Sequence, residues 1–317
     1  LDRLGMDVPT TYDEFIEMLT RFKNEIPECT APYTAPGLKS TQALPEFYQG
    51  ATADYVKVDG KWVDGMAQDN MLTALQNLQD AYTAGLIDQE AITNTTSSCR
   101  DEWYAGTVGC FPYWGGLWGE TLTVRLKQNV PDAEVIALPP IEGATYLYSA
   151  PSVQVISSKL SDEQVASVYK YFIEYMHDGG EGQVLFQSGV EGVHWQQSGN
   201  NIDPLPTISK PAEAFRKAWI TPWLALTPMT ATDKNVEVSQ EVTDSLAVVS
   251  ANAKNISVFP VSEQRTMITS DLTTTRENII SRVAMGQLTP EEGMAEYKAQ
   301  AETLNVAQAL EEMNANA

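Results

Sequence analysis

Apolar residues recur at helical spacing along several stretches of the chain, and capping residues mark where these helices begin. A Ser or Thr followed three residues later by Glu or Gln forms a capping box, which satisfies free backbone N–H groups at a helix start. Thr11 with Glu14 predicts a helix over about 11–24, and Ser161 with Gln164 predicts one that ends at Gly179. The other predicted helices are a short one at 44–49, one from Asp69 to Gly85, and helices over 119–129, 233–253, 271–285 (capped by Asp271) and 290–313 (capped by Thr289, with Pro290 in the first turn).

The helix after Ser161 carries a marked apolar stripe. We expect its members to face inward; they are Val165, Val168, Tyr169, Phe172, Ile173 and Met176.

Alternating apolar and polar residues predict strands between these helices. Residues 55–64 alternate around Asp59-Gly60, which is the signal of a β-hairpin. Further strands are predicted over 107–113, 133–138 and 151–157, and loops over 25–50 and 189–211. Strands interspersed with helices predict an α/β fold with a partly parallel sheet.

Length and charge narrow the function classes. A chain of 317 residues exceeds one ordinary core, so two lobes are expected. Lys and Arg total 20 against 42 Asp and Glu, a net charge of −22, which argues against nucleic-acid partners and anionic membranes. No apolar run approaches the roughly 18 residues of a membrane span. Cys29, Cys99 and Cys110 match no metal-ligand spacing, and we expect reduced thiols.

The most informative local feature is the run Phe-Pro-Tyr-Trp-Gly-Gly-Leu-Trp at 111–118. It follows a predicted buried strand and contains no ionisable acid or base. Flat ring faces beside two glycines suit a flat, partly polar ligand such as a sugar ring. The alternative is that these rings fill the core.

Several segments together resemble one known family. They are Leu1–Phe15, Asp59-Gly-Lys-Trp62, Tyr82-Thr-Ala-Gly-Leu-Ile-Asp-Gln-Glu90, Gly106–Trp114, Leu138-Pro-Pro-Ile-Glu-Gly143, 151–178 and 271–286. In order and spacing they are similar to extracellular solute-binding proteins of sugar ABC importers, which are related to maltose-binding protein. The chain is most similar to the large lipoprotein-type members from Gram-positive bacteria.

The resemblance implies a type II periplasmic-binding-protein fold, with two lobes, a hinge and an incomplete first lobe. Residues 1–149 would form the first part of the second lobe, 150–200 a return segment of the first lobe, and 201–317 the helical C-terminal part of the second. The loop at 25–37 lacks the acidic insert of many of these lipoproteins, so we expect no calcium site, no other metal and no cofactor.

The resemblance also indicates which residues would contact a ligand at the cleft. Trp114 and Tyr113 come first, by their place after a strand. Trp118 could equally be a core anchor, and Tyr148 could equally pack at the hinge. Trp195, Glu191 and Gln196 lie in a Gly-rich polar loop that borders the cleft in the family. Trp219 and Trp223 are more simply hinge residues.

The function implied is delivery of a carbohydrate, in particular an oligosaccharide, to the membrane permease of an ABC importer. The protein would be a monomer on the surface of a Gram-positive cell, tethered by a lipidated cysteine upstream of Leu1. Without a complete first lobe, we expect weak or absent sugar binding by these residues alone.

Two alternatives stay open at this stage. One is a surface adhesin of the same fold, binding a glycan or a protein. The other is a glycoside-acting enzyme, but we expect no catalysis. Only His194 is a conceivable base, since His177 ends a helix, and none of the common hydrolase or nucleotide-binding motifs accompanies it.

Overall fold

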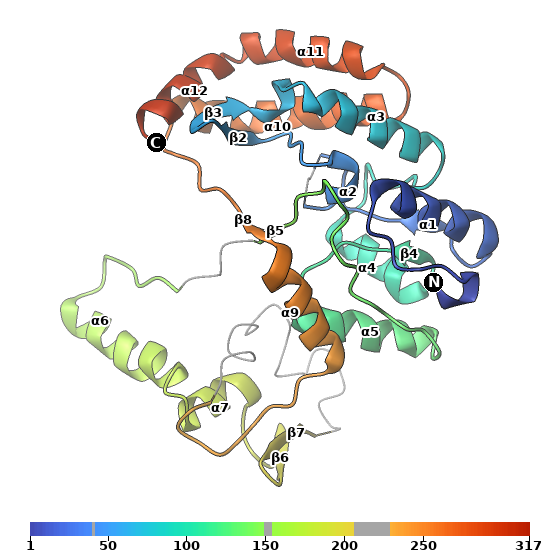
Figure 1. Cartoon of the computed structure of the whole chain (residues 1–317). Helices are drawn as coiled ribbons and strands as arrows, with labels where there is room; N and C mark the ends of the chain where they lie inside the picture. Colours follow the sequence, from blue (N-terminus) through green and yellow to red (C-terminus); the bar gives the residue numbers. More distant parts are fainter. Residues whose placement is uncertain (40–41, 149–153, 206–228) are drawn as a thin grey trace. The chain divides into compact units, whose positions relative to one another are not determined.

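The computed structural model describes residues 1–39, 42–148, 154–205 and 229–317 (Figure 1). The chain forms two compact units. Unit 1 comprises Leu1–Trp114, Leu122–Ala150 and Leu246–Ala317, and unit 2 comprises Gly115–Thr121 and Pro151–Ser245. The division falls inside helices α5 (Leu117–Asn129) and α9 (Gln240–Asn252). The sequence-based division placed residues 201–245 in the same lobe as residues 1–149. The structure instead groups them with residues 151–200 in unit 2.

Unit 1 begins with helix α1 (Tyr12–Glu25), whose capping box forms as predicted. The Glu14 backbone N–H donates to Thr11 Oγ1 (3.3 Å), and the Thr11 N–H donates to Glu14 Oε2 (3.0 Å). Backbone N–H groups of Thr10 and Thr11 stabilise the Glu14 carboxylate and lower its pKa to about 2. The opposite face of the helix buries Phe15 and Leu19 in the core of unit 1.

The other helical segments that lie wholly in unit 1 follow the predicted pattern in part. They are η1 (Asp2–Leu4), α2 (Pro45–Tyr48), η2 (Gly65–Ala67), α3 (Asn70–Thr83), α4 (Thr96–Ala105), α10 (Glu263–Ala284), α11 (Pro290–Thr303) and α12 (Val306–Ala315). Two predictions were wrong. Helix α10 starts after Ser262, not at Asp271, because Ser262 Oγ accepts from the Arg265 N–H at 2.9 Å. The helix predicted over 290–313 is broken at Asn305, where φ is 57°.

The strands of unit 1 make small sheets. Strand β1 (Ala31–Tyr33) lies parallel to β4 (Val108–Cys110), and β5 (Leu147–Tyr148) lies parallel to β8 (Lys254–Asn255). The predicted hairpin is confirmed as β2 (Tyr55–Val58) and β3 (Lys61–Asp64). The mixture of helices and parallel strands confirms the α/β class.

The strands differ from the sequence-based prediction at three places. β1 lies inside the predicted loop over 25–50 and was missed. The strand predicted over 133–138 is wrong, since this segment is irregular and Ile136 is exposed. Of the strand predicted over 151–157, residues 154–157 form no strand and 151–153 lie outside the described residues.

Gly109 lets β4 approach its neighbours closely. A Cβ atom at this position would lie 2.5 Å from Phe22 Cδ2 and 2.9 Å from the Pro32 carbonyl oxygen. We expect Gly109→Ala to lower the free energy of unfolding by about 1–3 kcal/mol, as overpacking does in other cores. Urea unfolding measures this, and adding Phe22→Leu should restore part of the loss. An unchanged unfolding midpoint for Gly109→Ala would contradict the close approach.

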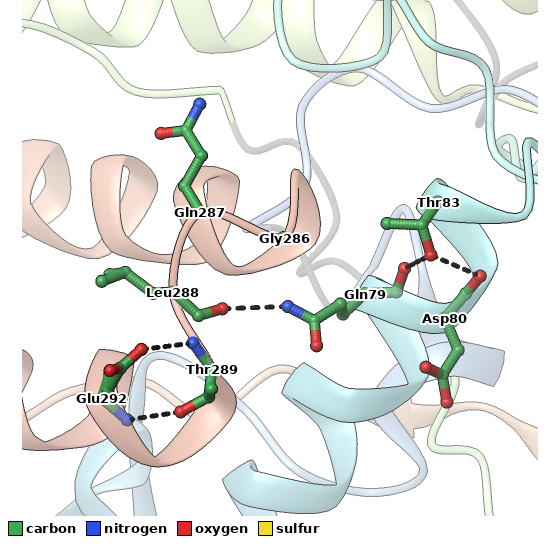
Figure 2. A pocket seen from close by; sticks show the side chains of 8 residues that line it. All are labelled: Gln79, Asp80, Thr83, Gly286, Gln287, Leu288, Thr289 and Glu292. Carbon is green, nitrogen blue, oxygen red and sulfur yellow. Dashed lines mark hydrogen bonds between the residues drawn. The ribbon is translucent and has the colours of Figure 1, made fainter.

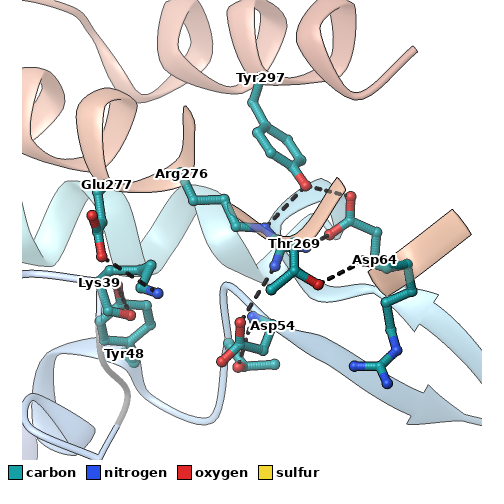
Figure 3. Close-up of polar contacts among 10 residues, drawn as sticks. Lys39, Tyr48, Asp54, Asp64, Thr269, Arg276, Glu277 and Tyr297 are labelled. Atoms are coloured by element: carbon teal, nitrogen blue, oxygen red, sulfur yellow. Dashed lines mark hydrogen bonds and ion pairs between the residues drawn. The ribbon is translucent and has the colours of Figure 1, made fainter. Parts of the chain in front are cut away.

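A buried ionic network joins α10, α11 and the hairpin of unit 1 (Figure 3). Arg276 Nη2 donates to Asp64 Oδ1 at 2.7 Å, and Arg276 Nε donates to the Tyr297 hydroxyl at 3.1 Å. Tyr297 in turn donates to Asp64 Oδ2 at 2.6 Å. Arg276 also reaches the exposed carboxylate of Asp54 at 3.3 Å. Burial reaches at least nine-tenths for each of Arg276, Asp64 and Tyr297. Because water does not reach these groups, removing one of them would leave a buried charge or hydroxyl of the others without its partner.

Unit 2 contains α6 (Asp162–Val168), the π-helical segment η3 (Tyr169–Glu174), α7 (Glu181–Ser188) and a hairpin of β6 (Trp195–Ser198) and β7 (Asn201–Pro204). The capping box at Ser161 and Gln164 is confirmed. The hairpin lies inside the predicted loop over 189–211 and was missed.

The inward stripe predicted for α6 and η3 is wrong over most of its length. Val168, Tyr169 and Phe172 are exposed, and Met176 is its only fully buried member. Neither α6 nor η3 buries a residue on any of its faces, so the apolar stripe does not mark a side packed into a core.

Two further observations bear on the class of protein. None of the helices in the described part of the chain is long and apolar enough to cross a membrane. All three cysteines are free thiols, as predicted. Burial raises the pKa of Cys29 and of Cys99 to about 11, so neither forms a reactive thiolate at neutral pH.

Candidate functional site

The carboxyl ends of three parallel segments meet at one edge of the small sheet in unit 1. β1 pairs with β4 on one side, and Tyr33 makes a parallel bridge with Ile87 on the other. The Asp88 N–H donates to the Tyr33 carbonyl at 2.8 Å. The chain therefore leaves this edge at Thr34, Asp88 and Phe111. Ligands of α/β proteins bind outside the carboxyl ends of parallel strands, so this edge is the candidate binding site of unit 1.

Four aromatic rings run from this edge as one continuous strip, formed by Trp103, Phe111, Tyr113 and Trp114. The Trp103 and Phe111 ring centroids lie 6.0 Å apart, and those of Phe111 and Tyr113 lie 4.9 Å apart. Tyr113 and Trp114 meet edge to face at 4.8 Å. The first three rings are half-buried, whereas Trp114 is 56% exposed. The aromatic strip thus ends in a large, accessible ring.

Helix α4 supports the aromatic strip from one side. Arg100 Nη1 donates to the Tyr113 hydroxyl oxygen at 2.8 Å, and Arg100 Nη2 donates to Ser97 Oγ at 2.9 Å. The guanidinium carbon also lies 6.0 Å from the Tyr113 ring centroid. Burial raises the pKa of Tyr113, although Arg100 opposes this rise, so the phenol keeps its proton at neutral pH.

A cluster of polar side chains, the edge cluster, lies at the same carboxyl edge and consists of Thr34, Asp88, Asn94 and Glu102. Thr34 Oγ1 lies 2.8 Å from Glu102 Oε2 and 3.2 Å from Asp88 Oδ2, but its single proton serves one carboxyl at a time. Asn94 Nδ2 donates to Asp88 Oδ2 at 2.5 Å. Burial, and then the charge of Asp88, raise the pKa of Glu102. The edge cluster ties α4 to the end of β1.

Sequence reasoning found Tyr113 and Trp114 and missed Arg100 and the edge cluster. The structure brings Tyr113 and Trp114 together, as the local run of aromatics indicated. The edge cluster has no comparable local signal, because its members come from three separate segments and one of them follows the missed strand β1.

The other predicted site residues differ in accessibility. Trp118 and Trp195, both in unit 2, are 7% and 3% exposed. Trp195 Nε1 donates to the Gly189 carbonyl at 3.0 Å, and its ring packs with Val184 and Ile202.

The remaining predicted contacts are accessible where the structure describes them. Tyr148, in unit 1, is 48% exposed, and Glu191 and Gln196, in unit 2, are also exposed. Trp219 and Trp223 lie outside the described residues.

The core of unit 1 holds a buried carboxyl group, that of Glu46, which forms no ion pair with any described residue. The Tyr146 hydroxyl donates to Glu46 Oε1 at 2.8 Å. The Tyr33 hydroxyl lies 3.0 Å from Glu46 Oε2 and 2.9 Å from the Ala43 carbonyl oxygen, and its single proton serves one of them at a time. Burial raises the pKa of Glu46, and hydrogen bonds from its own backbone N–H and from the two tyrosines offset the rise only in part.

Glu46 should make stability depend on pH. Because its folded-state pKa is raised, its contribution is fully present below the unfolded pKa of about 4.5 and is lost as pH rises through the folded value. We expect Glu46→Gln, which is neutral at every pH, to gain stability relative to wild type between pH 4.5 and 7. Urea midpoints at the two pH values test this. The exposed Glu90, replaced by Gln, is the control, and an equal pH response of both variants would contradict the prediction.

Two further hollows lie away from the aromatic strip, and the polar side chains of the first are engaged in structural hydrogen bonds. One, of about 330 Å³, lies between α3 and the turn from α10 to α11 (Figure 2). Its Gln79 amide donates to the Val283 and Leu288 carbonyls, and its Thr289 and Glu292 form the capping box of α11. The other, of about 450 Å³, follows η3 in unit 2. Within the described ranges, no group of three or more His, Cys, Asp or Glu is placed to hold a metal ion.

Comparison with known proteins supports the fold. No family model matches the chain. It is 21% identical to lipoprotein LipO of Bacillus subtilis (strain 168) over 213 residues, which are 62% of this chain and 42% of LipO. The match thus spans less than half of that relative.

Solved structures cover the whole chain. The alginate-binding protein AlgQ2 matches 100% of this chain and 69% of its own, with a TM-score of 0.68 and 17% identity. A solute-binding protein associated with an HMO-binding ABC transporter of Bifidobacterium longum infantis has a TM-score of 0.66 and 15% identity. The match covers 99% of this chain and 71% of that protein. The S. pneumoniae ABC-transporter substrate-binding protein FusA, solved with kestose, has a TM-score of 0.64 and 17% identity. The match covers 99% of this chain and 69% of FusA. The chain therefore has the periplasmic-binding-protein fold that the sequence predicted.

Proposed function

We propose that this chain, with the fold of ABC-transporter solute-binding proteins, binds a carbohydrate and delivers it to an ABC importer without altering it. The observation that carries the proposal is the aromatic strip at the carboxyl edge of the unit 1 sheet, which ends in the exposed Trp114. An indole face stacks on the C–H face of a pyranose, and nearby polar groups satisfy the hydroxyls.

The predicted residues take different parts in this proposal. Trp114 and Tyr113 form the stacking platform, and Tyr148 adds a second exposed ring in unit 1. Glu191 and Gln196 are exposed on unit 2, and their role as hydroxyl contacts stays a prediction. Trp118 and Trp195 are buried, so they would meet a ligand only by a ring edge and chiefly hold their segments in place.

The relatives define the proposed ligand class and setting. FusA was solved with kestose, AlgQ2 is an alginate-binding protein, and another neighbour is an N-glycan transport protein of Streptococcus pneumoniae. An oligosaccharide is the class these ligands share. LipO is a lipoprotein of Bacillus subtilis, and this likeness supports our proposal of an anchor at the surface of a Gram-positive cell. The monomeric state and the membrane permease as partner are further parts of the proposal.

Saturation-transfer NMR tests the proposal, because it detects dissociation constants into the millimolar range. We expect transfer to at least one of kestose, alginate oligosaccharides and an N-glycan, with the C–H protons of one ring face saturated most strongly. The sugar should be recovered unchanged after prolonged incubation. Absence of transfer to all three would contradict carbohydrate binding, and hydrolysis of the probe would contradict a non-catalytic role.

A further inference from the structure

The segments that leave the carboxyl edge of the unit 1 sheet carry more acids than bases. They are residues 34–37, 88–105 and 111–114, and their charged side chains are Asp88, Glu90, Arg100, Asp101 and Glu102. Four carboxyl groups therefore stand against one guanidinium on the segments that carry the aromatic strip. This surplus has the same sign as the charge of the whole chain, −22.

Two of these carboxyl groups lie close together in the edge cluster. Asp88 and Glu102 are both half-buried, and each has an oxygen within 3.2 Å of Thr34 Oγ1. Asn94 Nδ2 donates to Asp88 Oδ2 at 2.5 Å and lies 3.3 Å from Glu102 Oε1. Two carboxyl groups this close share one proton at most, so the pair stays negative at neutral pH.

Cys99 lies between the edge cluster and the aromatic strip. Its Sγ is 3.6 Å from Thr34 Oγ1, and the next residue, Arg100, donates to the Tyr113 hydroxyl. Burial raises the pKa of Cys99, and the charges of Glu102 and Asp88 add to the rise. Cys99 also interacts electrostatically with Tyr113. A ligand stacked on the aromatic strip would therefore lie in the electric field of the edge cluster.

We propose that the edge cluster makes the aromatic strip selective for neutral oligosaccharides over acidic ones. This inference rests on the proposed function and narrows its ligand class. A uronate ring stacked on the aromatic strip would bring its own carboxylate toward Asp88 and Glu102, whereas a neutral ring would not. The two carboxyl groups need no contact with the ligand, because like charges repel across several ångströms.

Matched sugars test the selectivity. The probes are kestose, a neutral N-glycan and the same two sugars with their primary hydroxyls oxidised to carboxylates. By saturation-transfer titration at 10 mM salt, we expect wild type to bind a neutral sugar about threefold to tenfold more tightly than its oxidised form. The preference should shrink at 1 M NaCl, where the Debye length is about 3 Å. A preference that salt leaves unchanged would overturn the inference.

Variants separate repulsion from loss of a hydroxyl contact. Glu102→Gln, alone and combined with Asp88→Asn, keeps the shape of the edge cluster and removes its charge. We expect the combined change to reduce the preference for the neutral sugar to less than half of the wild-type ratio. Glu291→Gln is the control, because Glu291 is exposed on α11, well apart from α4 in Figure 1, and should leave the ratio unchanged.

The outcomes distinguish the inference from the proposed function. If wild type binds a neutral sugar and its oxidised form equally, or binds only alginate oligosaccharides, the selectivity is overturned and sugar binding stands. The same holds if the combined variant keeps the wild-type ratio. If wild type binds none of these sugars, the proposed function is overturned, and the selectivity with it.

Discussion

Replacing Arg276 by alanine is expected to lower the free energy of unfolding by about 3–5 kcal/mol, the cost of breaking a buried ion pair by removing one partner. The variant would leave the Asp64 carboxylate buried. Of the two network residues that donate to this carboxylate, Arg276 and Tyr297, Tyr297 alone would remain (Figure 3). It would also remove the cation that lies 5.2 Å from the Tyr55 ring centroid. Urea unfolding followed by circular dichroism measures the loss.

The same two helices provide a matched control. Arg282 Nη1 on α10 contacts Glu296 Oε1 on α11 at 2.6 Å, but both side chains are about one-third exposed. Pairs that water can reach contribute roughly 0–1 kcal/mol, so Arg282→Ala should cost far less than Arg276→Ala. Equal losses would show that burial does not set the strength of the Arg276 pair.

A third variant tests whether the cost arises from the unpaired charge. Replacing Arg276 by Met, Asp64 by Leu and Tyr297 by Phe removes the three buried polar partners while keeping similar volumes, and leaves only the exposed Asp54. Buried ion pairs replaced in this way are often as stable as the original. We therefore expect the triple variant to recover most of the stability lost in Arg276→Ala. A triple variant as unstable as the single one would indicate that the network also fixes the packing of α10 and α11.

The sequence predicted best those features whose causes are local. The capping boxes at Thr11 and Ser161, the N-cap at Thr289 and the Asp59-Gly60 hairpin are all confirmed, because the groups that form them lie within a few residues of one another. The start of α10 was missed for the opposite reason. Ser262 caps the helix locally, but Arg265 stands three residues on, so no capping box marks this start. The acidic partner is Glu312, far along the chain, which accepts from Ser262 Oγ at 2.7 Å and from the Gln264 N–H at 3.0 Å.

Short strands were harder to predict because they are defined by their neighbours. β1 is only three residues long, is buried throughout and contains Pro32, so it has neither alternation nor length. The β6–β7 hairpin did carry a signal, the Gly199-Asn200 pair at its turn, which the polar composition of the segment obscured.

The same distinction applies to the candidate site. The aromatic strip could be predicted in part, since Phe111, Tyr113 and Trp114 are nearly consecutive. The edge cluster could not, because Thr34, Asp88 and Glu102 meet only after β1, the Ile87 bridge and α4 are in place.

Trp114→Ala should have the largest effect on the proposed function, a loss of at least about tenfold in affinity for the sugar that binds wild type, or about 1.4 kcal/mol. The reason is geometric. Trp114 is the most exposed ring of the aromatic strip, and edge-to-face contact with Tyr113 at 4.8 Å fixes its orientation before a ligand arrives. Trp114→Phe keeps a smaller face in the same place and should lose less. Saturation-transfer titrations give the affinities.

Tyr171 supplies the control for exposed aromatic surface in general. It lies in unit 2, on η3, and is 69% exposed, more than Trp114. Tyr171→Ala removes a comparable exposed ring, so any loss shared by both variants reflects non-specific adhesion of sugars to aromatic surface. Because both rings are exposed, neither change should shift the melting temperature by more than about 2 °C. Equal affinities for the two variants would exclude Trp114 as the stacking platform, whereas a loss confined to Trp114→Ala would place the sugar on the aromatic strip.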